Sequence, residues 1–408
     1  MVPLTIHQAR WLVPVSEPIL ENGAVVVAGP RIVAVGPASR LRRHYQGKCI
    51  DHGDGALLPA LVNAHVHLEF SALRGRIPRQ AALGHWLSAA MAEFAQLSAA
   101  EIHHGVQEGL AELWRYGTIL VGEVSNTGLS LPGLLNSGLG FHYFYECLGF
   151  DRLGSGPLEA DFPIFASPEA RARDNFSAAA HAPYSVSPAL FGRIFDWNLR
   201  YRRRTTVHLA ESRQEVEFLR QGNGFFQHLL QQRGRWPADY QPPQCSPVVY
   251  LDRLGGLGPQ TLAVHAIWLD AADRELLARR LSWAVLCPRS NLFTGAGFPR
   301  LSELYRAGVR LALGTDSLAS NDDLNIFNEI MTLQQQYPDF APDKLLALAT
   351  CQGALALGRG HDLGSLGPGK LAALLFIPVA SDRHFWPDLL AAGAAGKISW
   401  VTAPGVES

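Results

Sequence analysis

Eight short apolar segments, each ending in polar residues, recur through the middle of the 408-residue chain. Longer stretches with helical periodicity, such as residues 100–117 and 212–234, separate them. The apolar segments span residues 57–69, 117–125, 140–149, 176–187, 205–212, 262–270, 283–291 and 309–320. A strand followed by a helix, repeated eight times, is typical of a (β/α)8 TIM barrel. We therefore predict an α/β fold with a barrel over residues 58–360.

The two ends of the chain have a different texture. Residues 1–57 contain short β-branched runs, and two of them, within residues 21–37, are separated by a Gly-Pro turn typical of a hairpin. Residues 364–378 repeat this pattern with a Gly/Pro-rich turn before an apolar strand. We predict that residues 1–57 and 361–408 combine in a small β-sandwich beside the barrel.

Composition argues against several classes of partner. The formal net charge is −1, with 35 basic and 36 acidic residues, so neither nucleic acid nor an anionic membrane is expected. The five cysteines form no CxxC pair, which favours free thiols in a reducing compartment. The first residues lack the features of a secretory signal, and no apolar run is long enough to span a bilayer. We expect a cytoplasmic protein.

Ligand-type residues stand at the ends of the predicted barrel strands, where active sites of this fold lie. His65 and His67 close the first strand, and their spacing of two aims both imidazoles to the same side. His208 ends the fifth strand and Asp316 follows the eighth. Imidazole and carboxylate suit Zn, Fe(II) or Mn, and such a metal can activate water near neutral pH. We predict one divalent metal, with zinc preferred over iron or manganese.

The motifs around these residues carry a resemblance that covers nearly the whole chain. LPALVNAHVHLEF, HAPYSVS, VHLAES, VHAIWLD, CPRSN and LGTDSLASN are similar to motifs of the amidohydrolase superfamily, in its cytosine, guanine and S-adenosylhomocysteine deaminase branch. The resemblance implies a barrel with a β-sandwich from both chain ends. It also implies one metal, held by His65, His67, His208 and Asp316.

The same resemblance implies a hydrolytic deamination. Glu211 stands in an H-x-x-E pattern with the strand-five histidine and would protonate a ring nitrogen of the base, while activated water attacks C6 of a 6-aminopurine. His265 would hydrogen-bond the water and stabilise developing charge, and Asp316 would take the proton of the water. Strand four, residues 176–187, contains no lysine, which argues against a dinuclear cyclic-amide hydrolase.

For the substrate, the motifs look most like those of the aminodeoxyfutalosine deaminases of the alternative menaquinone route. Their substrate is an adenine nucleoside with a carboxyphenyl-ketone arm, and Arg74 or Arg289 is a candidate to pair with its carboxylate. Trp86 matches a ribose-side tryptophan of this branch, and His181 matches its substrate-contacting histidine.

Several alternatives stay open from the sequence alone. S-adenosylhomocysteine or adenosine is the nearest rival substrate. A hydrolase that displaces chloride or alkylamine from a triazine ring would use the same Glu211. The alternative outside the enzymes is a metal-binding barrel without catalytic activity. The expected partner is a small-molecule substrate, with a homodimer as a possible assembly.

Overall fold

The computed structural model describes residues 2–379 and 383–405, and it contains the eight predicted barrel strands in the predicted order. The strands are β6 (Leu61–Val66), β7 (Thr118–Ser125), β8 (Gly140–Cys147), β9 (Phe176–Ala180), β10 (Thr205–Leu209), β11 (Thr261–His265), β12 (Trp283–Leu286) and β13 (Arg310–Leu313). Six of them, all except β8 and β13, are buried at every residue. Burial on both faces is the pattern of parallel strands covered by helices.

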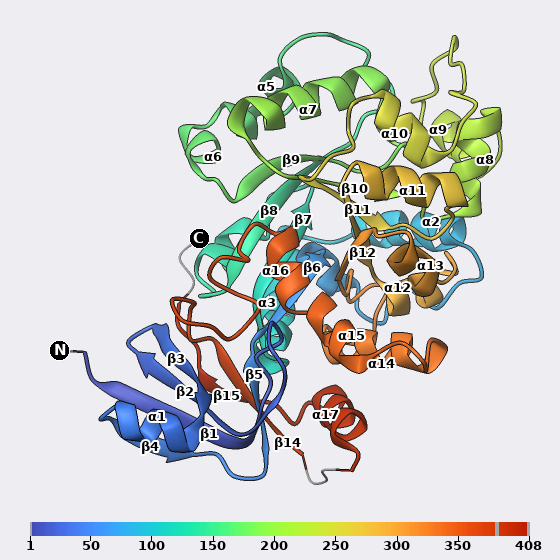
Figure 1. The fold of residues 1–408 in the computed structure, drawn as a ribbon. Helices are drawn as coiled ribbons and strands as arrows, with labels where there is room; N and C mark the ends of the chain where they lie inside the picture. The colour runs from blue at the N-terminus through green and yellow to red at the C-terminus, as the bar shows by residue number, and fades with distance from the viewer. Residues whose placement is uncertain (1, 380–382, 406–408) are drawn as a thin grey trace.

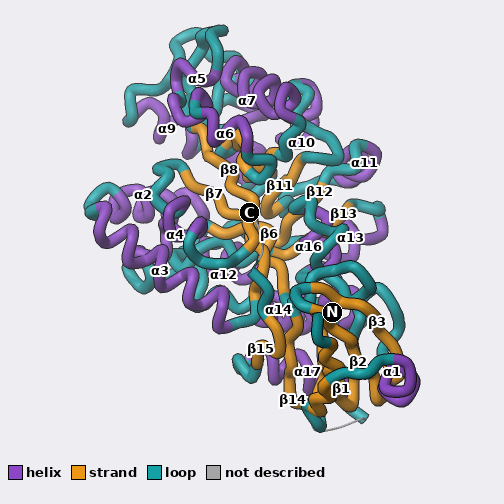
Figure 2. The backbone as a smooth tube through the Cα atoms, turned by 90° about the vertical axis from the view of Figure 1, so that its left-hand side faces the viewer, coloured by secondary structure: helices purple, strands orange, loops and turns teal. Residues whose placement is uncertain are grey.

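Helices surround these strands, as Figure 2 shows. After β6 come η1 (Leu68–Leu73), α2 (Leu83–Phe94) and α3 (Ala99–Arg115); after β7, α4 (Leu131–Leu135); after β8, α5 (Leu158–Asp161), η2 (Pro163–Ala166) and α6 (Pro168–Ala172); after β9, α7 (Pro188–Tyr201). The second half carries α8 (Arg213–Gln221), α9 (Phe225–Gln232), α10 (Pro247–Arg253), α11 (Ala271–Arg279), α12 (Pro288–Thr294), α13 (Leu301–Arg306), α14 (Ile326–Gln336), α15 (Pro342–Leu348) and α16 (Cys351–Ala356).

One helical stretch differs from the sequence pattern. Residues 212–234 read as a single helix, but the chain forms α8 and α9 with a break between them. Gly222 ends α8 with a φ of 72°, and Gly224 follows with a φ of 87°. Glycine tolerates this left-handed region without the penalty of a Cβ atom, so the two glycines end one helix and start the next.

The barrel consists of two four-stranded parallel sheets, β6–β9 and β10–β13, that meet at two seams. At one seam the backbone N–H of His208 donates to the carbonyl of His181 over 2.9 Å. At the other, Val66 and Asp316 form an isolated parallel bridge, and the N–H of His67 donates to the carbonyl of Asp316 over 3.2 Å. Each seam therefore lies beside residues that the sequence predicts as functional.

The two ends of the chain meet in one sheet, where blue and red strands lie side by side in Figure 1. Its strands are β1 (Leu4–Leu12), β2 (Leu20–Ala28), β3 (Arg31–Pro37), β4 (Lys48–Asp51), β5 (Gly55–Pro59), β14 (Leu374–Pro378) and β15 (Ser399–Thr402), with α1 (Ala38–His44) and α17 (Phe385–Ala394) beside them. The predicted hairpin is β2–β3, antiparallel.

The seven strands of this terminal sheet are joined by hydrogen bonds, and both chain ends contribute to it as predicted. The long strand β1 connects its parts, because it pairs with β2 along one edge and with β4 and then β5 along the other. The assignment of residues 1–57 and 361–408 to a separate domain stays a prediction. Among the described residues, no helix combines the length and apolar character needed to cross a bilayer.

Candidate metal centre and active site

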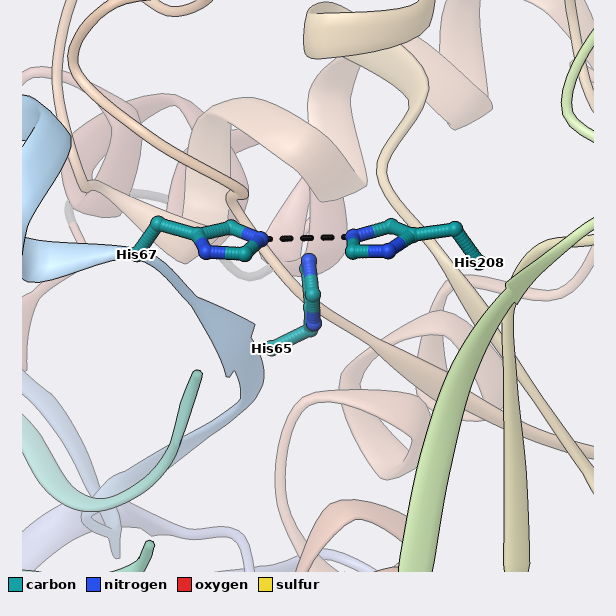
Figure 3. Close-up of side chains that lie close together, drawn as sticks. All are labelled: His65, His67 and His208. Carbon is teal, nitrogen blue, oxygen red and sulfur yellow. Dashed lines mark hydrogen bonds between the residues drawn. The ribbon is translucent and has the colours of Figure 1, made fainter. Parts of the chain in front are cut away.

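Three predicted histidines converge at the carboxyl ends of the barrel strands, as Figure 3 shows. His65 lies in β6, His67 is the first residue beyond that strand, and His208 lies in β10. One ring nitrogen from each lies within 4.8 Å of the others, and Nε2 of His67 is 3.3 Å from Nε2 of His208. All three side chains are buried. The structure thus brings together nitrogen donors from both halves of the barrel.

Asp316 completes this cluster from the turn after β13. Its Oδ1 lies 3.7 Å from Nε2 of His65 and 3.8 Å from Nε2 of His67. Its Oδ2 accepts hydrogen bonds from the hydroxyls of Ser290 (2.5 Å) and Ser320 (3.0 Å). The two oxygens are therefore differentiated, one facing the imidazoles and the other fixed by hydroxyl groups.

The donor set fits a divalent metal ion. Both ring nitrogens of His65 are buried and have no hydrogen-bond partner, a costly state unless a ligand satisfies one of them. His208 donates its Nδ1 proton to the carbonyl of His181 over 2.9 Å, which leaves Nε2 with a free lone pair. Three imidazoles and one carboxylate match the ligand types that zinc and its neighbours accept.

The electrostatics of the cluster also favour metal binding. Burial lowers the pKa of His67 to about 3 and the pKa of His208 well below its usual value, with neighbouring imidazoles adding to the effect. Burial alone would raise the pKa of Asp316, but the adjacent imidazoles of His65 and His67 hold that pKa below its ordinary range. His67 and His208 are therefore neutral and the aspartate is ionised, the protonation states in which these residues bind metals.

Glu211 and His265 are the residues predicted for acid–base chemistry, and we call this pair the acid–base side of the site. The four predicted metal ligands, His65, His67, His208 and Asp316, form its metal-ligand side. Oε1 of Glu211 lies 3.4 Å from Nε2 of His265, and both side chains are buried. Nδ1 of His265 lies 2.8 Å from Oδ1 of Asn291, which fixes the ring and places its proton on Nδ1. Burial raises the pKa of Glu211 well above its ordinary value and lowers the pKa of His265 to about 4. At neutral pH the imidazole is therefore uncharged, and the direction of the Glu211 shift favours the protonated form of its carboxyl.

The backbone is held in unusual conformations at these strand ends. Ala210, His265, Ala266 and Asp316 all have positive φ values, between 48° and 71°. Such values are costly for residues with a Cβ atom and persist where surrounding contacts enforce them. Glu215 supplies part of that constraint, because its carboxyl accepts the backbone N–H groups of Ala210 (2.9 Å) and Glu211 (2.8 Å).

Two predicted substrate residues lie near this cluster. The His181 ring lies 5.1 Å from the His208 ring, and its Nδ1 is 2.6 Å from the hydroxyl of Ser185. Trp86 is only 7% exposed and sits in an apolar cluster with residues such as Ile267 and Ala319. Its indole N–H donates to the carbonyl of Ala319 over 3.4 Å. In this structure the indole N–H of Trp86 is therefore bound to the backbone of a neighbouring loop. The contact of Trp86 with a ribose stays a prediction.

The predicted carboxylate-binding arginines already have internal partners. Arg74 is paired with Glu112, and Arg289 binds Asp323 over 2.7 Å and approaches Asp322 over 3.4 Å. These ion pairs neutralise both guanidinium groups, so an incoming carboxylate would have to displace an acid of the protein. The structure therefore gives no support to these two residues as the anchor for a substrate carboxylate.

The sequence reasoning missed several residues that support the site. Ser290 and Asn291, both in the CPRSN motif, orient Asp316 and His265. Glu146, at the end of β8, places Oε1 3.6 Å from Nδ1 of His208, and burial raises its pKa to about 8. The position of Glu146 at the end of a barrel strand could have identified it as a site residue. The partners of Ser290 and Asn291 lie 26 residues away, and the sequence spacing did not indicate them.

A barrel with three imidazoles, an aspartate and a buried glutamic acid gathered at one mouth is typical of a metal-dependent hydrolase. Residues 56–392 match the model of the Amidohydrolase family, so the chain belongs to this family. A shorter match, over residues 23–45, is to the imidazolonepropionase-like composite domain of bacteria. These matches confirm the predicted family and the metal-dependent hydrolase fold.

Similar proteins agree with the predicted branch of the family. A 5-methylthioadenosine/S-adenosylhomocysteine deaminase of Syntrophobacter fumaroxidans is 32% identical over 88% of this chain and 80% of its own length. An aminodeoxyfutalosine deaminase of Deinococcus radiodurans is 29% identical over 82% of this chain and 81% of its own. The crystal structure of a zinc-bound adenosine deaminase from Xanthomonas campestris is 28% identical, with a TM-score of 0.81 over 99% of this chain and 94% of that chain.

Proposed function

We propose that this protein is a zinc-dependent deaminase that replaces the 6-amino group of an adenine nucleoside by an oxo group and releases ammonia. The observation that carries the proposal is the buried Glu211 carboxyl, which lies beside the metal-ligand cluster and 3.4 Å from His265, and whose pKa is raised by burial. Addition of water to an aromatic amidine carbon requires protonation of the adjacent ring nitrogen, and a carboxylic acid in reach can supply that proton. The names of the similar proteins support the same reaction class.

In this proposal the side chains divide the work. Glu211 donates its proton to the ring nitrogen next to C6 as water adds to that carbon. His265, whose proton lies on Nδ1, accepts a hydrogen bond from the attacking water at Nε2. Asp316 accepts the proton that the attacking water loses and passes it to the departing amine. The hydroxyl that the water leaves on C6 gives up its own proton as the oxo group forms, and this proton restores the acid form of Glu211, so that water and the amino nucleoside give the oxo nucleoside and ammonia.

His65, His67, His208 and Asp316 would hold the zinc ion, which lowers the pKa of water and stabilises charge on its oxygen when bound. The hydrogen bonds from Ser290 and Ser320 keep Oδ2 of Asp316 in place. The free lone pair on Nε2 of His208 depends on the carbonyl of His181. The chain thus sets the protonation state of each ligand before a substrate arrives.

Two substrate types follow from the similar proteins, an adenine nucleoside with a sulfur-containing 5′ substituent and aminodeoxyfutalosine. The identities of 32% and 29% are too close to rank them. Both contain the adenine that the proposed chemistry needs. We therefore propose an adenine nucleoside with an extended 5′ substituent as the substrate class.

The test is an ultraviolet assay of the zinc-loaded protein with aminodeoxyfutalosine, S-adenosylhomocysteine, 5-methylthioadenosine and adenosine, run with ammonia detection. The expected result is loss of the adenine absorbance with one ammonia released per nucleoside consumed. Turnover of only one compound would identify the substrate within the class. No change with any of them, with bound zinc verified, would refute adenosine-type deamination and favour a triazine-type hydrolase.

A further inference from the structure

A second hollow lies on the rim of the barrel, outside the metal cluster. It has a volume of about 450 Å³ and is lined by α8, by the segment after β11 and by the first turn of α11. Arg213 and Arg220 reach it from α8, while Ile267, Trp268 and Asp270 form the opposite wall. We call it the rim cavity. None of its lining residues has a role in the chemistry proposed above.

A guanidinium group and an indole ring define one wall of the rim cavity. The guanidinium carbon of Arg213 lies 4.4 Å from the centre of the Trp268 ring, a cation–π contact. The indole N–H of Trp268 donates to the carbonyl of Ala296 over 2.7 Å, which fixes the ring under the arginine. Within residues 2–379 and 383–405, Arg213 makes no hydrogen bond or ion pair. Its planar fork of N–H donors therefore stays available for a ligand.

The acids of the rim cavity are largely occupied. Asp270 and Asp273 form a capping box at the start of α11, and Asp273 also accepts the hydroxyl of Ser246. Glu217, the third acid, lies one turn along α8 from Arg213 on an exposed position. Arg220, two turns from Arg213, likewise makes no ion pair in the part of the chain that the structure describes. Of the other cations, Arg300 pairs with Glu303 and the charge of Arg220 acts on Asp273, so Arg213 is the cationic donor of the cavity that no acid engages among the described residues.

Short connections join the rim cavity to the catalytic groups. Arg213 follows Glu211 by two residues, a span of at most about 7 Å between their Cα atoms. The backbone N–H groups of Ile267 and Trp268 both donate to the carbonyl of Ala210, over 3.1 and 2.8 Å. The wall of the cavity and the turn that carries Glu211 are thus one hydrogen-bonded unit.

We infer that the rim cavity binds an anionic group, a carboxylate, on the 5′ substituent of the nucleoside, and that Arg213 is its specificity-determining residue. The inference rests on the proposed function. Arg213 stacked on Trp268 is pre-ordered, so little side-chain entropy is lost when its N–H donors meet a carboxylate. This assignment replaces Arg74 and Arg289, which are paired with acids.

The experiment compares two nucleosides that differ in this group. S-adenosylhomocysteine carries a carboxylate on its 5′ substituent, and 5-methylthioadenosine does not. Steady-state kinetics of the zinc-loaded wild type, Arg213→Gln and the control Arg279→Gln, an exposed arginine on α11, are measured with both. We expect Arg213→Gln to raise KM for S-adenosylhomocysteine about tenfold or more and to leave 5-methylthioadenosine unchanged. Arg213→Lys, which keeps the charge but loses the planar fork, should fall between.

Two results would overturn the inference. Equal losses for both nucleosides would show that Arg213 serves the fold or the catalytic turn, and no loss for either would show that the carboxylate binds elsewhere. Failure of the proposed function is distinguishable, because the wild type would then deaminate neither nucleoside. In that case the dissociation constants of both compounds, measured by calorimetry with wild type and Arg213→Gln, still test the charge preference of the cavity.

Discussion

The metal-ligand side and the acid–base side of this site are both buried, and burial acts in opposite ways on an imidazole of the first and on the carboxyl of the second. On the ligand side it removes protons, lowering the pKa of His67 to about 3. On the acid–base side it adds one, raising the pKa of Glu211 well above its ordinary value. Both shifts follow from the same cost of a charge in a dry environment. One buried mouth thus supplies lone pairs for a metal and a proton for a base.

The two sides also differ in what holds them. On the ligand side, the backbone carbonyl of His181 fixes His208, while the strand bridge and the hydroxyls of Ser290 and Ser320 hold Asp316. The acid–base side depends on side chains, Asn291 for His265 and Glu215 for the turn at Glu211. We therefore expect the acid–base side to be altered by single substitutions that leave the ligand side intact.

The largest expected effect comes from Glu211→Gln. The amide keeps the size of the side chain but cannot donate a carboxyl proton, so kcat should fall about a thousandfold or more while zinc remains bound. Kinetics and metal analysis of the same preparation measure both. Glu275→Gln, at an exposed position of α11, is the matched control and should keep full activity. Retained turnover in Glu211→Gln would remove this residue from the acid role.

A smaller effect is expected from Asn291→Ala. Loss of the 2.8 Å hydrogen bond frees the His265 ring to rotate and to move its proton between nitrogens, so kcat should fall about 10- to 100-fold with KM little changed. Asn223→Ala, at an exposed position, serves as the control. A change in zinc content with kcat per bound zinc preserved would contradict the separation of the two sides.

The smallest expected effect is on the thermal stability of the protein with and without zinc. Zinc binds the folded ligand set and not the unfolded chain, so zinc at a hundred times its Kd adds about 2.7 kcal/mol of stability. Chelation should therefore lower Tm by several degrees. His65→Ala should show the lower Tm with and without zinc, whereas Glu211→Gln should respond to zinc as the wild type does. An equal loss of the zinc response in both variants would mean that Glu211 belongs to the ligand side.

The sequence was sufficient to predict that the four residues of the metal-ligand side lie together, because their positions follow from short spacings and from strand order. His65 and His67 are two residues apart on one strand, and His208 and Asp316 follow strands whose order along the chain sets their place in a barrel. The eight strands were readable for the same reason. The family match confirms this fold class and the metal-dependent hydrolase reading.

The sequence was insufficient where partners are remote. The spacing of residues in the sequence did not indicate that Arg289 would pair with Asp323, or that Arg213 would lie over Trp268, 55 residues along the chain. Nor did the β-branched runs of the terminal segments indicate which strands would pair, since the pairing of β1 with both β4 and β5 depends on how far β1 extends. Such outcomes are decided by tertiary packing and not by local pattern.

Because the proposed ligands come from both sheets of the barrel, the ligand set is complete only when the barrel is closed. His65 and His67 belong to the sheet β6–β9 and its end, whereas His208 and Asp316 belong to the other half, and each seam lies beside a ligand. With the proposed ligand set, a chain in which each half has formed but the ring is open would hold only part of a metal site. Metal capture at full affinity would then require the two halves to join, and the set is complete only once β13 and the turn after it are in place.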